Sequence, residues 1–117
     1  MNRTFLLIGA VAGCIAVGFG AFGAHALKGR LSPEMLATFE TGVRYQMYHG
    51  LALLAVALAS PHVAGRLAVA AGWLFTSGIV LFSGSLYILV LAGIPIMGAV
   101  TPLGGVAFIA GWLCLVA

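Results

Sequence analysis

The stretch TFLLIGAVAGCIAVGFGAFGAHA, from Thr4 to Ala26, decides the fold class of this protein. It contains no Asp, Glu, Lys or Arg. An α-helix of about 20 apolar residues is long enough to cross the hydrocarbon core of a bilayer. The run is also longer than the apolar core of a secretory signal peptide, so we expect it to be an uncleaved first membrane span.

The whole chain has the same character, with 63% hydrophobic and 6% charged residues in 117 positions. Soluble domains carry roughly 25% charged residues to cover their surface, so this composition indicates that the solvent is lipid. The formal net charge of +3 comes from dispersed cations near the ends of apolar runs, where such residues anchor a helix at the lipid headgroups. No basic cluster alternates with aromatic residues, which argues against nucleic acid as a partner.

Breaks rich in Gly, Pro or charge divide the chain into apolar segments of one membrane domain, residues 1–117. We expect spans over residues 4–26, 44–60, 67–91 and 102–117. Ser32-Pro33-Glu34 is typical of a helix start, because it supplies a capping oxygen, a preset φ and a negative charge. Residues 33–43 are then predicted to form an amphipathic segment, and Thr101-Pro102 resembles a second capped start. The predicted fold is an all-α integral membrane four-helix bundle with an amphipathic extension before the second span and both termini on one side.

Small residues recur in the first span at alternating steps of four and three, which places them along one helix face. They are Gly9, Gly13, Ala16, Gly20 and Gly23. Such a stripe lets another helix approach closely in a membrane. We therefore predict a packing seam, with a clash when Gly13 or Gly20 is replaced by a large residue.

Polar residues gather in the first half of the second long helix. Glu40 and Arg44 are four residues apart, which is the spacing of an ordinary ion pair on an exposed helix face. The alternative is a partly buried pair beside a polar cavity, since ionisable groups within spans are costly and often functional. We hypothesise one connected polar patch near a membrane face, made of Glu40, Arg44, Tyr45, Tyr48 and His49, with His25 close by.

The sequence predicts no metal, no cofactor and no catalytic residue. His25 and His49 lack a third ligand at a telling spacing, and Cys14 and Cys114 both lie inside apolar runs as small hydrophobes do. Ser83 and Ser85 flank Gly84 without forming a nucleophile elbow. We expect these serines to pack or to form hydrogen bonds between helices.

Five motifs in order resemble a known family over nearly the whole chain: GAFGAHAL from Gly20, YQMYHG from Tyr45, FSGSLY from Phe82, TPLGG from Thr101 and FIAGW from Phe108. They are similar to the small membrane proteins grouped as domain of unknown function 423, related to transmembrane protein 256. The resemblance implies a four-span protein, in the inner membrane if the source is bacterial. It implies no activity, so it assigns no catalytic or ligand residue.

Abundant packing signals and few polar groups favour a non-enzymatic role in structure, assembly or support of other membrane proteins. The alternative is a small oligomeric transporter or channel lined by the predicted polar patch. A third and weaker alternative is binding of haem, quinone or lipid between the helices. We expect membrane lipids as partners, with a homo-oligomer or other membrane proteins as further candidates.

Overall fold

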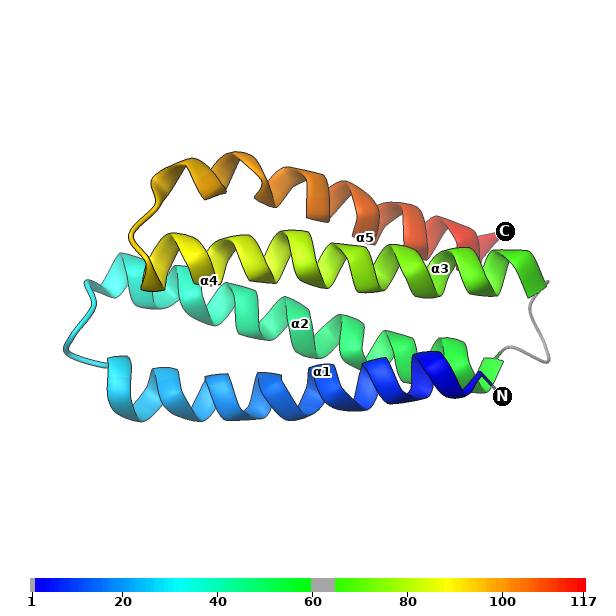
Figure 1. Cartoon of the computed structure of the whole chain (residues 1–117), viewed down its shortest axis with the longest axis horizontal. Helices are drawn as coiled ribbons and strands as arrows, with labels where there is room; N and C mark the ends of the chain where they lie inside the picture. Colours follow the sequence, from blue (N-terminus) through cyan, green and yellow to red (C-terminus); the bar gives the residue numbers. More distant parts are fainter. Residues whose placement is uncertain (1, 60–64) are drawn as a thin grey trace.

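The computed structural model describes residues 2–59 and 65–117. Within them the chain forms four long helical segments that lie side by side (Figure 1). The helical elements are α1 (Arg3–Phe22) with the π-helix η1 (Gly23–Leu27), α2 (Pro33–Ala59), α3 (Gly65–Gly78) with the π-helix η2 (Ile79–Ser83) and α4 (Gly84–Leu91), the 3₁₀-helix η3 (Pro95–Ala99), and α5 (Thr101–Val116). We call the four long segments rods: α1 with η1, α2, α3 with η2 and α4, and η3 with α5.

The described residues form an all-α bundle of four rods, as predicted. Three rods in this part of the chain are long and apolar enough to cross a membrane: Arg3–Leu27, Gly65–Leu91 and Pro95–Val116. The fourth rod is α2, which is equally long but carries charged residues along its first half.

Neighbouring rods run in opposite directions, so the two chain ends lie at the same end of the bundle (Figure 1). Helix α1 packs along α2, and the α3–η2–α4 rod packs against α5; α2 then joins the two hairpins by contacting α3, η2 and α4. The bundle measures 47 × 26 × 18 Å. Both turns at the opposite end contain a glycine with positive φ, Gly29 at 87° and Gly93 at 67°, a conformation in which side chains are strained.

Of the two helix starts predicted from the sequence, the one at Ser32 is confirmed and the one at Thr101 differs. The Ser32 Oγ accepts a hydrogen bond from the Met35 N–H at 3.2 Å, as expected of a cap. Thr101 is not a cap, because it is the first helical residue and its hydroxyl faces Ser85 at 2.6 Å. The Thr101 side chain forms a hydrogen bond to another helix and does not cap its own.

Residues 33–43 are not an extension that stands apart from the bundle. They belong to the unbroken helix α2, and Phe39 and Gly42 within them are buried. Phe39 lies among three rings, with centroid distances of 5.9 Å to Phe19, 6.4 Å to Phe22 and 5.3 Å to Tyr87. The amphipathic pattern therefore marks a helix with one packed side.

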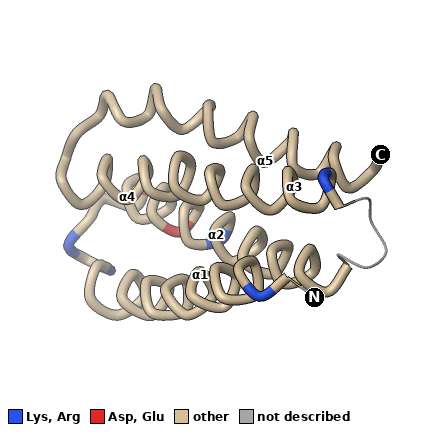
Figure 2. Tube along the Cα trace, turned by 45° about the vertical axis from the view of Figure 1, so that its right-hand side comes forward, with Lys and Arg blue, Asp and Glu red and all other residues tan. Residues whose placement is uncertain are grey.

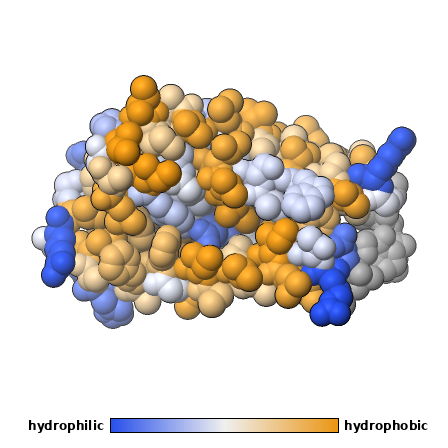
Figure 3. Space-filling view, viewed as in Figure 1, coloured by the Kyte–Doolittle hydropathy of each residue, from blue (hydrophilic) through white to orange (hydrophobic). Residues whose placement is uncertain are grey.

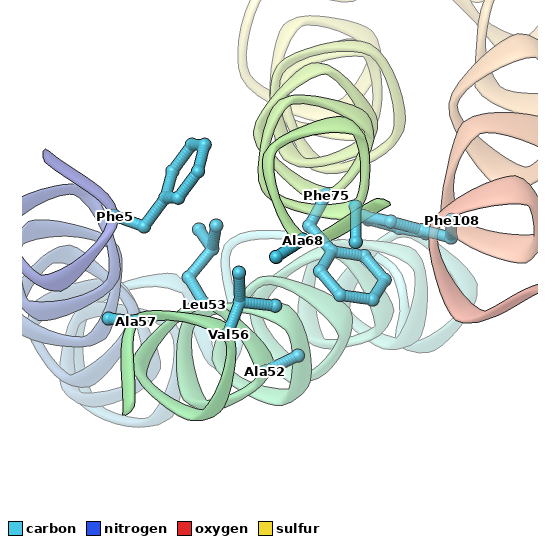
Figure 4. Close-up of a cluster of buried hydrophobic side chains, with 9 residues drawn as sticks. Phe5, Ala52, Leu53, Val56, Ala57, Ala68, Phe75 and Phe108 are labelled. Atoms are coloured by element: carbon cyan, nitrogen blue, oxygen red, sulfur yellow. The ribbon is translucent and has the colours of Figure 1, made fainter. Parts of the chain in front are cut away.

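The hydrophobic core has two parts. The larger lies toward the end of the bundle that holds the termini, where Phe5 from α1, Leu53 and Val56 from α2, Phe75 from α3 and Phe108 from α5 come together (Figure 4). The smaller surrounds Phe39 near the other end. Glycines make room for the rings: Phe5 packs on Gly72, Phe108 on Gly78 and Phe75 on Gly111.

The small-residue stripe of α1 lies against α2, but its tight points differ from those expected. A Cβ added to Gly9 would stand 2.7 Å from the Gly50 carbonyl oxygen, and one on Gly23 would stand 3.1 Å from the Phe39 ring. Ala16 is also buried. At Gly20 the nearest atom is at an ordinary 3.6 Å, and at Gly13 nothing lies within 4 Å. The predicted clash at Gly13 is therefore wrong, because a Cβ there would meet open space although the Gly13 backbone lies near Gly50 of α2.

Candidate functional site

The predicted polar patch separates into an outer and an inner part. Glu40, Arg44 and Tyr48 are exposed on the outer face of α2, whereas His49 is buried with only 4% of its surface exposed. One red and one blue segment of α2 stand inside the length of the bundle, while other cations lie toward its two ends (Figure 2); Glu34 lies in the first turn of α2. The ring of Tyr45 contacts those of Tyr48 and His49, at centroid distances of 5.6 and 6.3 Å.

The charged members of the patch are not joined to one another. Arg44 donates from Nη2 to the Thr41 hydroxyl at 3.4 Å, and no ion pair joins it to Glu40 in the part of the chain that the structure describes. His25 is exposed in η1, with no described contact to the patch. Among the six predicted residues, Tyr45 makes ring contacts with Tyr48 and with His49.

Hydrogen bonds position His49 between α2 and α5. Its Nδ1 lies 2.8 Å from the Tyr45 carbonyl oxygen, and the Trp112 indole N–H lies 3.1 Å from its Nε2. A carbonyl only accepts and an indole N–H only donates, so the ring is neutral with its proton on Nδ1. The ring also stacks on Phe108, with centroids 3.6 Å apart and planes 7° apart. Both ring nitrogens are therefore engaged within the protein.

A second polar group, which the sequence analysis did not single out, is Gln46. Its Nε2 donates to the Ala12 carbonyl of α1 at 2.9 Å, and its Oε1 accepts from the Tyr87 hydroxyl of α4 at 2.6 Å. One amide thus joins three helices. The available signal was the one Gln of the sequence, placed inside a predicted span, since lipid forces such a group to find a partner.

The serines behave as expected and bond between helices. Ser83, at the end of the η2 π-helix, donates to the Gly42 carbonyl of α2 at 2.6 Å. Ser85 lies 2.6 Å from the Thr101 hydroxyl of α5. Among residues 2–59 and 65–117, every buried side-chain nitrogen and oxygen has a hydrogen-bond partner.

Two grooves lie between the helices, one between α1 and the α3–η2–α4 segment and the other between α2 and α5. The α1–α3 groove has a volume of about 560 Å³, an apolar lining and the Gln46–Tyr87 pair in its wall. The α2–α5 groove, of about 530 Å³, is mostly aromatic; it is lined by Tyr45, Tyr48, His49, Phe82, Gly105, Phe108, Ile109 and Trp112. Both volumes fall within the range of small-molecule sites. No group of three metal-binding side chains occurs in the described residues.

On the face that Figure 3 shows, the surface is mainly apolar, with hydrophilic residues at both ends and a smaller hydrophilic area near the middle. Exposed side chains include Leu7, Val80 and Val106. A surface of this kind suits contact with lipid chains. Polar chemistry is thus confined to the helix interfaces, the outer face of α2 and the two ends.

Comparison with known proteins gives consistent matches. The family model described as "Protein of unknown function (DUF423)" matches residues 19–105. The UPF0382 membrane protein YwdK of Bacillus subtilis is 51% identical over 115 residues, covering 97% of this chain and 94% of the relative. The UPF0382 membrane proteins SAB0533 of Staphylococcus aureus and SSP2132 of Staphylococcus saprophyticus are 48% and 50% identical over 117 residues; each match covers 97% of this chain, and 93% and 94% of the respective relative. No solved structure matches.

Proposed function

Because this chain belongs to the DUF423 family and its close relatives are bacterial membrane proteins, we propose that it is a four-span protein of the cell (inner) membrane with a non-enzymatic role. That role is structural: the bundle supports or assembles with other components of the membrane.

The observation that carries this proposal is how the buried polar groups are used. Gln46, His49, Ser83 and Ser85 each bond to a group on another helix. Hydrogen bonds between membrane helices contribute about 0.6 kcal/mol on average, so together they hold one arrangement of helices. A group committed in this way is not free to bind a solute.

The length and packing of α2 support the fourth span. Its 27 residues extend over about 40 Å at 1.5 Å per residue, which exceeds the roughly 30 Å hydrocarbon core. The helix lies alongside the other rods for most of their length (Figure 1). Removing it from the membrane would expose Leu53, Val56 and Phe75, which are fully buried against one another.

Cysteine labelling from the two sides of a membrane tests the topology. In a background with Cys14→Ala and Cys114→Ala, single cysteines replace Lys28, Arg66 and Ile94. Four spans require that Lys28→Cys and Ile94→Cys are labelled from one side and Arg66→Cys from the other. Labelling of Lys28→Cys and Arg66→Cys from the same side would show that α2 does not cross.

A flux assay separates the structural role from transport. Proteoliposomes holding the purified protein are expected to pass no more K⁺, Na⁺ or H⁺ than empty liposomes do. An ion flux above that of empty liposomes, if the Arg44→Gln variant abolishes it, would favour the alternative. That alternative is an oligomeric transporter or channel that uses the outer face of α2.

One observation favours a second candidate, binding of a quinone. The α2–α5 groove offers flat aromatic walls, and a Cβ on Gly105 would meet nothing within 4 Å. Gly105→Leu should therefore fill the groove without disturbing the fold. Quinone co-purifying with the wild type, detected by ultraviolet absorption, should be lost in this variant. Gly18→Leu on α1, which also has open space but lines neither groove, is the matched control.

A further inference from the structure

The outer face of α2 is unusual for a helix that crosses a lipid bilayer. Glu40, Arg44 and Tyr48 are exposed on it, and Thr41 is partly exposed beside them. Successive residues turn by about 100° around a helix, which places Glu40, Arg44 and Leu51 on one narrow strip. Small exposed residues, Ala37 and Ala55, lie on the same strip. The outer strip of α2 therefore combines one anion, one cation and small residues.

In the four-span arrangement proposed above, both charges lie at the depth of the hydrocarbon core. At 1.5 Å per residue, Glu40 is about 10 Å and Arg44 about 16 Å along the axis from Pro33. The bundle is 47 Å long, so a hydrocarbon core of roughly 30 Å leaves only about 8 Å at each end. A charged side chain at membrane depth is costly unless it meets a partner.

Residues 2–59 and 65–117 do not supply that partner. Arg44 makes a long 3.4 Å hydrogen bond to Thr41, and Glu40 has no ion pair with any described residue. Every interior polar side chain described above, by contrast, is bonded to a neighbouring helix. The missing partner should thus lie outside the chain and carry both signs of charge.

We propose that this partner is a second copy of the same chain, and that two copies pair through their α2 outer strips. Copies inserted in the same orientation place their α2 helices parallel, related by a twofold axis along the membrane normal. Such an interface is self-complementary, so Glu40 of each copy faces Arg44 of the other. The axial offset of four residues, about 6 Å, is within reach of the long arginine side chain, and small residues permit close approach.

This dimer rests on the four-span arrangement proposed above. The four-span arrangement and the dimer can be tested separately, because the labelling of Lys28→Cys and Arg66→Cys reports only whether α2 crosses the membrane. If α2 crosses and no dimer forms, the dimer alone is overturned.

Charge swaps test the pairing in native membranes. In the Cys14→Ala, Cys114→Ala background, Leu51→Cys reports the α2 strip through oxidative cross-linking, and Val106→Cys on the exposed face of α5 is the control position. Cross-linked dimer is expected at Leu51→Cys and not at Val106→Cys. Glu40→Arg or Arg44→Glu alone brings like charges together and should lower the yield at least about tenfold.

The double variant Glu40→Arg, Arg44→Glu restores the opposite charges and should restore the cross-linked dimer. Glu34→Arg, a matched charge change in the first turn of α2, should leave the yield unchanged. The proposal is overturned by equal cross-linking at both cysteines, by an unchanged yield in the single swaps, or by no recovery in the double swap. A monomer in lipid nanodiscs, or cross-linking of Leu51→Cys only to a different protein, would also overturn it.

Discussion

On the inner face of α2, Gln46 and His49 bond to side chains of α4 and α5, whereas on its outer face Glu40 and Arg44 bond to no other helix among the described residues. Arg44 and Gln46 are only two residues apart. One side of the helix is therefore bonded to neighbouring helices, and the other is left for the partner proposed above.

The difference shows how lipid selects positions for polar groups. A buried amide or imidazole is retained where a neighbouring helix supplies a matching donor or acceptor. Charges on the lipid-facing side are retained only if some other molecule meets them, because lipid chains cannot. Inner polar residues should thus affect folding of the monomer, and outer ones should affect association.

The largest expected effect is loss of a packed ring on the inner face. Phe39 is fully buried among Phe19, Phe22 and Tyr87, so Phe39→Ala should lower the free energy of unfolding by about 3 kcal/mol through the cavity it leaves. Leu51→Ala, on the outer face of the same helix and 56% exposed, should change it by less than about 0.5 kcal/mol. Reversible unfolding in detergent mixtures measures both, and equal losses would contradict the distinction between the faces.

A slightly smaller effect is expected where α1 meets the inner face of α2. Gly9→Leu forces a side chain against the Gly50 backbone and should cost about 2 kcal/mol by overpacking. Gly13→Leu, four residues along the same helix, has open space and should be close to neutral. Thermal unfolding in detergent compares the pair; a large loss at Gly13 would mean that the stripe packs along its whole length.

The hydrogen bond between Gln46 and Tyr87 should contribute about 1 kcal/mol, within the range found for bonds between membrane helices. Gln46→Leu, Tyr87→Phe and the double variant form a cycle that isolates this term. Because each single change removes the same 2.6 Å bond, the double variant should lose less than the sum of the two. Strictly additive losses would show that the pair is not coupled.

Apolar runs and breaks were enough to predict four helices, the position of the first turn and the cap at Ser32. Predicting which side of α2 faces the core was harder. His49 was assigned to the polar side of the helix together with Arg44, because an amphipathic pattern separates a polar from an apolar side. In lipid the rule fails, since both sides are largely apolar and polar groups with partners are buried.

The glycine stripe shows a second limit of sequence reasoning. Steps of four and three average 3.5 residues, close to the helical repeat of 3.6, so the sequence placed the stripe on one helix face, and the structure shows that this face meets α2. Gly13 nevertheless lies about 40° around the helix from Gly9. That rotation turns the Cβ direction of Gly13 away from α2. Which glycines of the stripe face α2 depends on the angle at which the two helices cross, and the sequence does not give that angle.

The smallest expected effect belongs to the outer face. Arg44→Gln removes one 3.4 Å hydrogen bond to the partly exposed Thr41, so the unfolding free energy of the monomer in dilute detergent should change by less than about 0.5 kcal/mol. The same variant in native membranes should weaken dimer cross-linking through Leu51→Cys, because Glu40 of the other copy loses its cation. Measuring the two quantities on one variant tests the contrast between the faces most directly. A monomer destabilised as strongly as by Gln46→Leu would place Arg44 within the folded chain's own network and remove the reason for a second copy.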